Sequence, residues 1–518
     1  MTGLEAFLLA QGPELLSRTY EHLSLTMVSL GIASAIGLPL GLWLTRRPAI
    51  SSIVLAAVSV LQTVPSLALL GILIPFTGIG RLPATIALLL YALLPIVRNT
   101  VVGIEHVEPA VREAAAGMGM TDGQVLTRVE LPLALPVIFA GVRTATVVSV
   151  GVATLAALVG AGGLGVYIFR GISLADTSLV LAGAVPAALL ALVLDAALGA
   201  VEKRLDRLFR PALAVLAALV ALSLLSGVGG PSAHALRVAV PAEFMERKDG
   251  YAGLATRYEL HAEVVEMDHG LMYRALAEDR VDAVVGYSTD GEIARFGLRV
   301  LPDDRKYFPP YWAAPLVRRE ALARHPELAS IFDKLDGRID ASKMSAMNAR
   351  VEHDHETPRA VARDFLRSIG VEPGPPRRSD PADVVIGSKI FAEQYVLAEM
   401  LAELVETYTP LHVKLSTGLG GTKICFEALR KGDIDVYPEY TGTGLFAILG
   451  GPANAGLKLE DATLVYEYVK REFDAKYGLS LLKPFGFENT YALIAREATV
   501  ARLGATGTSE FVERFGRR

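Results

Sequence analysis

Long apolar runs alternate with short polar connections over the first 230 residues of the chain. An apolar run of about 20 residues can cross a bilayer as a helix. Pro65, Pro95, Pro136 and Pro186 fall within or at the ends of such runs, where neighbouring helices can satisfy the freed carbonyl groups. The pattern predicts an all-α polytopic membrane domain with six spans at residues 23–44, 53–76, 82–102, 135–159, 178–201 and 212–228.

After residue 235 the apolar runs become short and alternate with helical patterns, which is typical of an α/β domain with mostly parallel sheets. Helical spacing recurs at 391–406 and at 356–366, where Thr357-Pro358 suits a cap and a first turn. The length is enough for two lobes with a small-molecule site between them. Strands are predicted at 236–240, 262–266, 281–287, 384–387, 412–415, 434–437 and 491–495.

Basic residues cluster on one side of the alternating topology, and the positive-inside rule places that side in the cytoplasm. They are Arg46, Arg47, Arg98, Arg112, Arg128, Lys203, Arg204, Arg207 and Arg210. We therefore expect a multi-pass protein of the cell (inner) membrane, in contact with lipid, whose residues 236–518 lie on the extracytoplasmic side.

A short motif between the third and fourth predicted spans carries Glu113-Ala114-Ala115, then Gly119, then Leu131-Pro132. Small alanines let a short helix approach a partner surface, and Gly119 allows a turn without a Cβ penalty. Leu131-Pro132 is expected to stop the local helix before the next span. The segment resembles the coupling loop of ABC-importer permeases, which implies an ATPase-coupling role for Glu113, Ala114, Ala115 and Gly119.

Composition excludes several other classes. The net charge of −5 does not favour a nucleic-acid partner. No Gly-x4-Gly-Lys-Ser/Thr segment is present, so ATP would be used by a separate subunit, and we expect no cofactor and no catalytic site. Adjacent acids and histidines at 352–356 more often form a solvated helix end than a metal site, and Cys425 alone cannot form a disulfide within the chain.

Residues 20–210 resemble the permease of the osmoprotectant (glycine betaine/choline/carnitine) ABC importers, through LQTVPSLALL, YALLPIVRNT and ALVGAGGLG. The rest resembles the solute-binding protein of that family. This resemblance implies a type I importer-like permease followed by a two-lobed domain like the type II periplasmic binding proteins. The motifs of the second part are VIGSKIFAEQ, TGLGGTKICFEAL, IDVYPEYTGTG, ENTYALIAR, ERKDGYAGL, VVGYSTDGEIARF and LPDDRKYFPPY.

The motifs of the binding protein stand in reversed order relative to the family, which predicts a circular permutation. The alternatives are an exchange of halves between two chains and a chimeric sequence that folds poorly. The predicted domains are a permease at 1–210 with its coupling loop at 105–132, a linking span and tether at 211–235, the second half of the binding domain at 236–370, a Pro-rich linker at 371–383, and its first half at 384–518.

The resemblance also implies an aromatic cage made of Tyr440, Tyr491, Tyr287 and Tyr311. A quaternary ammonium cannot donate hydrogen bonds, and ring faces hold it through cation–π contacts. A half-buried core ring is the alternative for each tyrosine alone. Candidate donors to a solute carboxylate are Thr443, Arg247, Lys389 and the neutral Gln394, although Arg247 could instead pair with Glu246 or Asp249, and Lys389 could be a solvated loop lysine.

We therefore expect a subunit that captures a quaternary-ammonium solute and also forms its pathway. The expected partners are a cytoplasmic ABC ATPase docked near Glu113 and a second copy of the chain, since one copy has few spans for a pathway. One alternative is a different solute in the same cage, such as ergothioneine or another trimethylammonium compound. An alternative from another class is a membrane-anchored solute sensor.

Overall fold

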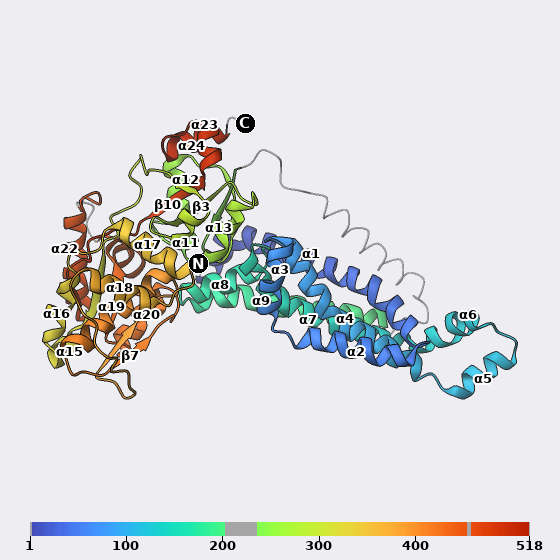
Figure 1. The fold of residues 1–518 in the computed structure, drawn as a ribbon. Coiled ribbons are helices and arrows are strands. Elements are labelled where there is room, and N and C mark those ends of the chain that lie inside the picture. Colours follow the sequence, from blue (N-terminus) through green and yellow to red (C-terminus); the bar gives the residue numbers. More distant parts are fainter. Residues whose placement is uncertain (1–2, 203–235, 453–456, 517–518) are drawn as a thin grey trace. The chain divides into compact units, whose positions relative to one another are not determined.

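The computed structural model describes residues 3–202, 236–452 and 457–516, which divide into two compact units (Figure 1). A helical unit contains nearly all of residues 3–202, and an α/β unit contains nearly all of residues 236–516. The predicted sixth span, at 212–228, lies outside the described residues.

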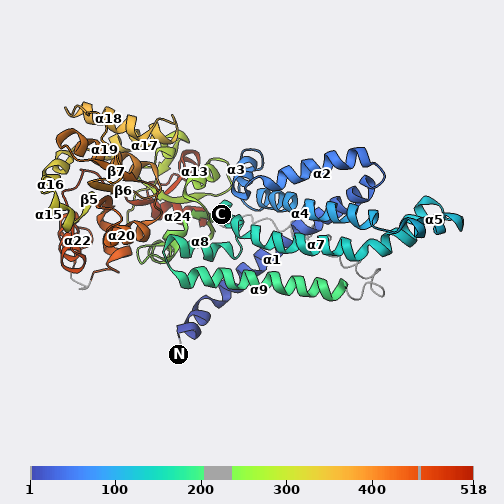
Figure 2. The same ribbon diagram turned by 90° about the horizontal axis from the view of Figure 1, so that it is seen from below.

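The helical unit is built around long apolar helices that pack side by side (Figure 2). Four of its described helices are long and apolar enough to cross a membrane, or five if the bent pair α2–α3 is one span. Its elements are α1 (Gly3–Leu44), α2 (Pro48–Thr63), α3 (Ser66–Thr77), α4 (Arg81–Glu105), α5 (Pro109–Gly117), α6 (Asp122–Val125), the π-helix η1 (Leu126–Glu130), α7 (Leu131–Ala153), the 3-10 helix η2 (Thr154–Val159), α8 (Gly165–Ser173) and α9 (Thr177–Glu202).

The second predicted span, at 53–76, is the bent pair, and its two helices meet at 98°. Val64 at the break has an extended backbone with ψ 126°. The ring of Pro65 disfavours a helical conformation at the residue before it, so the sequence Val64-Pro65 explains the bend.

The prediction that Leu131-Pro132 stops the local helix is wrong. Helical structure continues from Asp122 through α6, η1 and α7 to Ala153. Pro132 has no N–H, and its ring would crowd the carbonyl of Arg128 in a regular helix. The chain widens into a π turn just before the proline, and the N–H of Leu131 donates to the carbonyl of Leu126.

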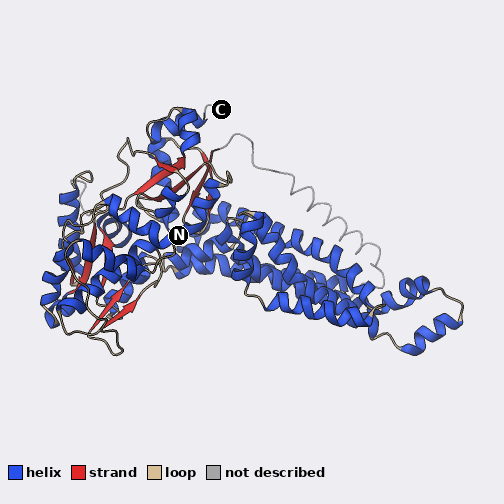
Figure 3. Ribbon diagram, in the orientation of Figure 1, coloured by secondary structure: helices blue, strands red, loops and turns tan. Residues whose placement is uncertain are grey.

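The α/β unit contains two five-stranded sheets flanked by helices (Figure 3). The first sheet has the order β2 (Ala262–Glu266), β1 (Leu236–Val240), β3 (Ala283–Tyr287), β10 (Tyr491–Arg496), β4 (Leu298–Val300). The second has the order β7 (Val413–Ser416), β6 (Val384–Gly387), β8 (Val436–Tyr440), β5 (Ala313–Arg318), β9 (Leu479–Leu481).

Both sheets are mixed, so the prediction of mostly parallel sheets is wrong. The pairs β1–β3, β6–β7 and β6–β8 are parallel, whereas β10 and β5 run antiparallel to both of their neighbours. These two strands are reached by chain segments that pass from one sheet to the other. Because β10 comes from the predicted 384–518 half and β5 from the 236–370 half, each sheet contains strands of both halves.

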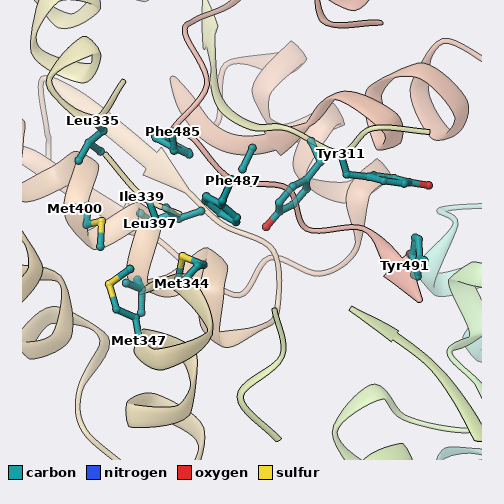
Figure 4. Packing of buried hydrophobic residues seen from close by; sticks show 14 of the residues in the cluster. Tyr311, Leu335, Ile339, Met344, Met347, Leu397, Met400, Phe485, Phe487 and Tyr491 are labelled. Atoms are coloured by element: carbon teal, nitrogen blue, oxygen red, sulfur yellow. The ribbon is translucent and has the colours of Figure 1, made fainter. Parts of the chain in front are cut away.

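A large buried core packs the helices against the sheets, with Tyr311 and Tyr491 at one end and Met344, Met347 and Met400 at the other (Figure 4). The remaining described elements are α11 (Ala242–Glu246), α12 (Tyr251–Tyr258), α13 (His269–Ala277), α14 (Gly291–Arg295), α15 (Arg319–Arg324), α16 (Glu327–Phe332), η3 (Asp333–Leu335), α17 (Ala341–Glu352), α18 (Pro358–Ser368), α19 (Ala392–Tyr408), α20 (Thr422–Lys431), α21 (Thr441–Thr443), η4 (Gly444–Ile448), α22 (Ala462–Tyr477), α23 (Glu497–Leu503) and α24 (Thr508–Gly516).

The Pro-rich segment 371–383 is fixed to the domain along its length. Arg363 donates to the carbonyl of Pro373 at 2.9 Å, and the N–H of Val413 donates to the carbonyl of Arg377 at 2.8 Å. Arg378 forms ion pairs with Glu399 at 3.0 Å and Glu406 at 2.8 Å, both on α19. The segment joins α18 to β6 as an ordered part of the fold.

Candidate functional site

Tyr287 and Tyr491 are direct cross-strand partners at the ends of β3 and β10. Directly opposed residues of an antiparallel pair project to the same face of the sheet. Their ring centroids lie 4.9 Å apart with an interplanar angle of 42°, and their hydroxyl oxygens are 3.4 Å apart. The strand register therefore places two of the four predicted cage residues side by side.

Tyr311 completes a three-ring cluster with this pair. Its ring meets the ring of Tyr491 edge-on, at 5.9 Å between centroids and 83° between planes. A Cβ on Gly442 would lie within 2.9 Å of three atoms of the Tyr311 ring, so only glycine at this position lets the tyrosine pack against the turn. The hydroxyl of Tyr311 donates to the Asp249 carboxylate.

Tyr440 lies further along the same series of rings. Phe391 stacks on Tyr287 at 5.3 Å and on Tyr440 at 6.4 Å between centroids, and so links the two. The Tyr440 hydroxyl donates to Glu393 at 2.7 Å and accepts from Gln394 at 3.0 Å. The structure thus brings Tyr287 and Tyr311 each into contact with Tyr491, and Phe391 connects Tyr440 to Tyr287.

Three phenylalanines in the cluster were not singled out from the sequence. Phe244 packs on Tyr491 at 4.7 Å, and Phe308 lies 6.2 Å from the same ring. Phe391 and Phe308 lie inside two motifs that carry the family resemblance, SKIFAEQ and KYFPPY. Their place in these motifs is the sequence signal that could have identified them as members of the aromatic cluster. Phe244 follows Pro241 by three residues on the short helix α11 and carries no such signal.

Arg247 and Lys389 are buried and are already paired with carboxylates. Arg247 donates to both oxygens of Asp249, at 2.9 and 2.6 Å, and its guanidinium carbon lies 5.3 Å from the Tyr491 ring centroid. Lys389 donates to Glu439 at 2.5 Å and lies 5.0 Å from the Tyr440 ring centroid. Of the alternatives for Arg247, the structure gives the pairing with Asp249, and the description of Lys389 as a solvated loop lysine is wrong.

Gln394 and Thr443 hold different positions. The side-chain amide of Gln394 donates to the carbonyl of Pro438 at 2.9 Å, and its oxygen accepts from the backbone N–H of Lys389 at 3.1 Å. Gln394 therefore braces the start of α19 against the end of β8. Thr443 is buried at the end of the short helix α21, next to the strand that carries Tyr440.

Glu393 is a fully buried carboxylate that receives four neutral donors. The hydroxyls of Tyr440 and Thr289 donate at 2.7 and 2.6 Å, and the amides of Asn489 and Asn348 donate at 2.9 and 3.2 Å. Burial raises the pKa of Glu393, although each of these hydrogen bonds opposes the shift. These donors come from separate segments of the chain. Their hydrogen bonds to Glu393 hold those segments next to the Tyr440 hydroxyl.

Glu243 adds a second carboxylate beside the rings. Its side chain is 3.5 Å from Arg247, and one of its oxygens lies 3.3 Å from the place where a Cβ on Gly421 would stand. Burial is the main cause of the raised pKa of Tyr287, and the nearby Tyr491 and Glu243 add to it. Among the residues named above, the carboxyl groups of Glu243, Asp249, Glu393 and Glu439 stand against the two cations Arg247 and Lys389.

The predicted coupling residues lie at one end of the helical unit, where α5 and α6 extend beyond α4 and α7 (Figures 1 and 2). Glu113 and Ala114 on α5 are exposed, whereas Ala115 is buried. Gly119 has φ +81°, the left-handed conformation that the sequence predicted for a turn. An exposed face with small side chains is thus presented by α5.

Two family patterns cover most of the chain. The pattern described as the substrate binding domain of the ABC-type glycine betaine transport system matches residues 216–368 and 382–511. The pattern described as the binding-protein-dependent transport system inner membrane component matches residues 37–207. The chain belongs to the ABC-type glycine betaine transport family. It joins an importer permease and a substrate-binding domain in one polypeptide, as predicted.

Individual relatives agree with this assignment. The carnitine transport permease protein OpuCB of Listeria monocytogenes is 49% identical over 207 residues, which cover 40% of this chain and 94% of that protein. The choline transport system permease protein OpuBB of Bacillus subtilis is 44% identical over 205 residues, with 40% and 94% coverage. The ergothioneine transport permease/ergothioneine binding protein EgtU of Helicobacter pylori is 26% identical over 479 residues, covering 65% of this chain and 87% of that protein.

Proposed function

We propose that the α/β unit binds a quaternary-ammonium solute of the glycine betaine, choline and carnitine class at the Tyr287–Tyr311–Tyr491 cluster. The observation that carries the proposal is the contact of three tyrosine rings from three separate motifs. Each ring face can attract a methylated nitrogen by roughly 0.5–2 kcal/mol. Relatives whose names state carnitine and choline transport support the same class.

The charges beside the rings favour a solute with a net positive charge. Arg247 and Lys389 are occupied by Asp249 and Glu439, so neither is a free donor for a solute carboxylate. Glu243 is held only at 3.5 Å from Arg247 and can attract a cation. On this basis a choline-like cation fits better than a zwitterion whose carboxylate needs a cationic partner.

Ergothioneine is a second candidate, because the relative EgtU matches over both the permease and the binding domain. Ergothioneine carries a trimethylammonium group that the same rings could hold. It also carries a carboxylate, which would require Arg247 or Lys389 to exchange partners. The two candidates therefore predict different roles for the Arg247–Asp249 pair.

For transport we propose that two copies of the chain form one pathway and that a separate ATPase subunit docks on α5. Permeases of this family are inner-membrane components of ABC importers, which supports the ATPase partner. The exposed Glu113 and Ala114 support α5 as the docking element. The positive-inside rule supports the extracytoplasmic side for the α/β unit, where it would receive solute.

We further propose that the binding domain is circularly permuted relative to the family. The strands of residues 236–370 and 384–518 that share both sheets support assembly within one chain. The ordered segment 371–383, which the family pattern skips between residues 368 and 382, supports its role as the added connection.

Calorimetry of the purified full chain against choline, glycine betaine, carnitine and ergothioneine tests the proposal. We expect the tightest binding for choline and measurable binding for at least one zwitterion. Tetramethylammonium, which has the headgroup alone, is a useful probe because it should bind through the rings only. The proposal fails if none of the methylated ammonium compounds binds.

A further inference from the structure

Glu130 is a fully buried carboxylate at the end of the π turn η1, and it bridges two arginines from different elements of the helical unit. Its Oε2 accepts from Arg46, just after α1, at 2.7 Å, and its Oε1 lies 3.0 Å from Nε of Arg112 on α5. The side chain of Glu130 is 1% exposed, against 51% for Arg46 and 33% for Arg112. The carboxylate is thus the inner member of a three-residue network.

The network joins three elements of the helical unit: the segment just after α1, the helix α5 and the π turn η1. Arg112 also donates to the carbonyl of Ile104 near the end of α4. On α5, Ala115 is the residue that is buried, so the helix has a small apolar contact of its own. Displacement of α5 would therefore pull on Glu130 and Ile104 through the Arg112 side chain.

The π turn gives Glu130 its position. A regular helix would rotate residue 130 by a different angle relative to α7, and the wide turn before Pro132 changes which side of the helix the carboxylate faces. An apolar cluster of Ile104, Ala134 and Ile138 lies beside it, packed with Leu126 and Leu131. A carboxylate beside apolar side chains depends on its charged partners, because losing one leaves a costly buried charge.

We propose that Glu130 is a positioning residue for energy coupling, which links movement of α5 to the start of α7 and the end of α1. When α5 moves, the Glu130–Arg112 contact transmits the displacement to Glu130 at the start of α7. The Glu130–Arg46 contact then transmits it to the end of α1. This inference rests on the proposed import function with an ATPase docked on α5. We expect a two-state change of α5 to reach α7 less efficiently when this network is broken.

The test is solute import by the complex of the chain with its ATPase subunit in vesicles, with radiolabelled choline as the probe. The quantity measured is choline moved per ATP hydrolysed. Glu130→Gln and Arg112→Gln are each expected to lower this ratio by about 2- to 30-fold, the range for mutations that disturb coupling between sites. Glu105→Gln, at the exposed end of α4, is the matched control and should keep the wild-type ratio.

A double-mutant cycle separates coupling from damage to the fold. If the two residues act through one contact, the double variant Glu130→Gln with Arg112→Gln should lower the ratio of choline moved to ATP hydrolysed no further than the stronger of the two single changes. Arg112 is partly exposed, so its variants are expected to fold even if Glu130→Gln lowers the yield of complex. Arg112→Lys keeps the charge but loses the planar donor pair. Its ratio is therefore expected to lie between those of the wild type and Arg112→Gln.

The inference is overturned if both Arg112 variants transport with the wild-type ratio, or if the two Gln effects add. A lower yield of complex with an unchanged ratio would also overturn it, since that outcome shows only a structural role. Failure of the wild-type complex to import choline or any solute of the panel contradicts the proposed function instead. The two failures are therefore distinguishable.

Discussion

Tyr287 and Tyr491 lie opposite one another in adjacent strands although 204 residues separate them along the chain. The Pro-rich segment 371–383 stands between them in the sequence, so the ring pair forms only when the segments on its two sides assemble. A solute held by these rings would stabilise that assembly, because it binds the folded form alone.

Replacing Tyr491 by Ala should weaken binding of choline or tetramethylammonium by about 1–2 kcal/mol, since one ring face is lost. Tyr491 touches the rings of Tyr287, Tyr311 and Phe244, so its removal breaks the ring contacts that hold this cluster together. Calorimetry of the purified chain measures the effect.

Tyr491→Phe serves as the control for that prediction because it keeps the ring and removes only the hydroxyl. Tyr408→Ala is a second control, at an exposed tyrosine of α19. Equal affinities for Tyr491→Ala and the wild type would mean that this cluster does not bind the cation.

Asp249→Asn should change which solutes bind. Asp249 accepts two hydrogen bonds from Arg247, and removal of its charge frees the guanidinium to meet a solute carboxylate. We expect affinity for glycine betaine to rise relative to choline by roughly tenfold, the equivalent of about 1.4 kcal/mol. Binding of both solutes measured in parallel gives the ratio, and a ratio that stays constant argues against Arg247 as the carboxylate partner.

Much of the fold could be predicted from the sequence because the pattern of short strands and capped helices is local. β1, β2 and β6 begin and end where the alternation of apolar residues predicts, and Thr357 caps α18 by accepting from the N–H of Ala360 at 3.3 Å. β4, β5 and β9 were not predicted. β4 and β9 are only three residues long, and their pairing depends on strands far away in the sequence.

The candidate site was predicted in part. The tyrosines could be named from motifs. Their positions relative to one another depend on the register of β3 with β10 and of β5 with β8, which the pattern of residues along the sequence does not specify. The pairing of Lys389 with Glu439 was missed for the same reason: the two charges are 50 residues apart and meet only in the folded sheet. The four-donor environment of Glu393 likewise appears only in three dimensions.

Glu352 should make the stability of the α/β unit depend on pH. Burial, with added repulsion from Asp290 and Glu292, raises the pKa of Glu352 from 4.5 to about 8. The folded chain therefore holds the proton more tightly than the unfolded chain, and this stabilisation is complete below pH 4.5 and lost as the pH rises through about 8.

Glu352→Gln cannot ionise and can still accept from the backbone N–H of Gly291, which donates to Glu352 at 3.0 Å. We expect its Tm to exceed that of the wild type by a margin that grows from pH 5 to pH 9, since each pKa unit corresponds to about 1.4 kcal/mol. Scanning fluorimetry of the full chain measures this. Asp354→Asn, an exposed neighbour, should follow the wild-type profile, and parallel curves for Glu352→Gln and the wild type would refute the prediction.

Arg378→Ala should loosen the Pro-rich segment. Arg378 pairs with Glu399 and Glu406, and the side chain of Glu406 is 0% exposed. Removing the cation leaves a buried carboxylate with fewer partners, which lowers the free energy of unfolding by up to about 3–5 kcal/mol.

Lys414→Ala removes an exposed pair with Asp380 that contributes about 0–1 kcal/mol and is the matched control. Denaturant unfolding and the rate of tryptic cleavage at Arg377 should separate the two variants, and equal rates would show that the segment is not held by this cation.

Glu113→Arg should abolish ATP-driven uptake while leaving solute binding intact, because the substitution places a bulky cation on the exposed face of α5 without touching the α/β unit. If the ATPase subunit docks on that face, the variant should also lose co-purification with it. A solute sensor that used the helical unit only as an anchor would not respond to the change. Uptake in vesicles, calorimetry and co-purification distinguish these outcomes on one preparation. Glu105→Gln, which alters a charge at the end of the neighbouring helix α4, should leave all three measurements at the wild-type level. Uptake that survives Glu113→Arg would place the ATPase dock elsewhere on the helical unit.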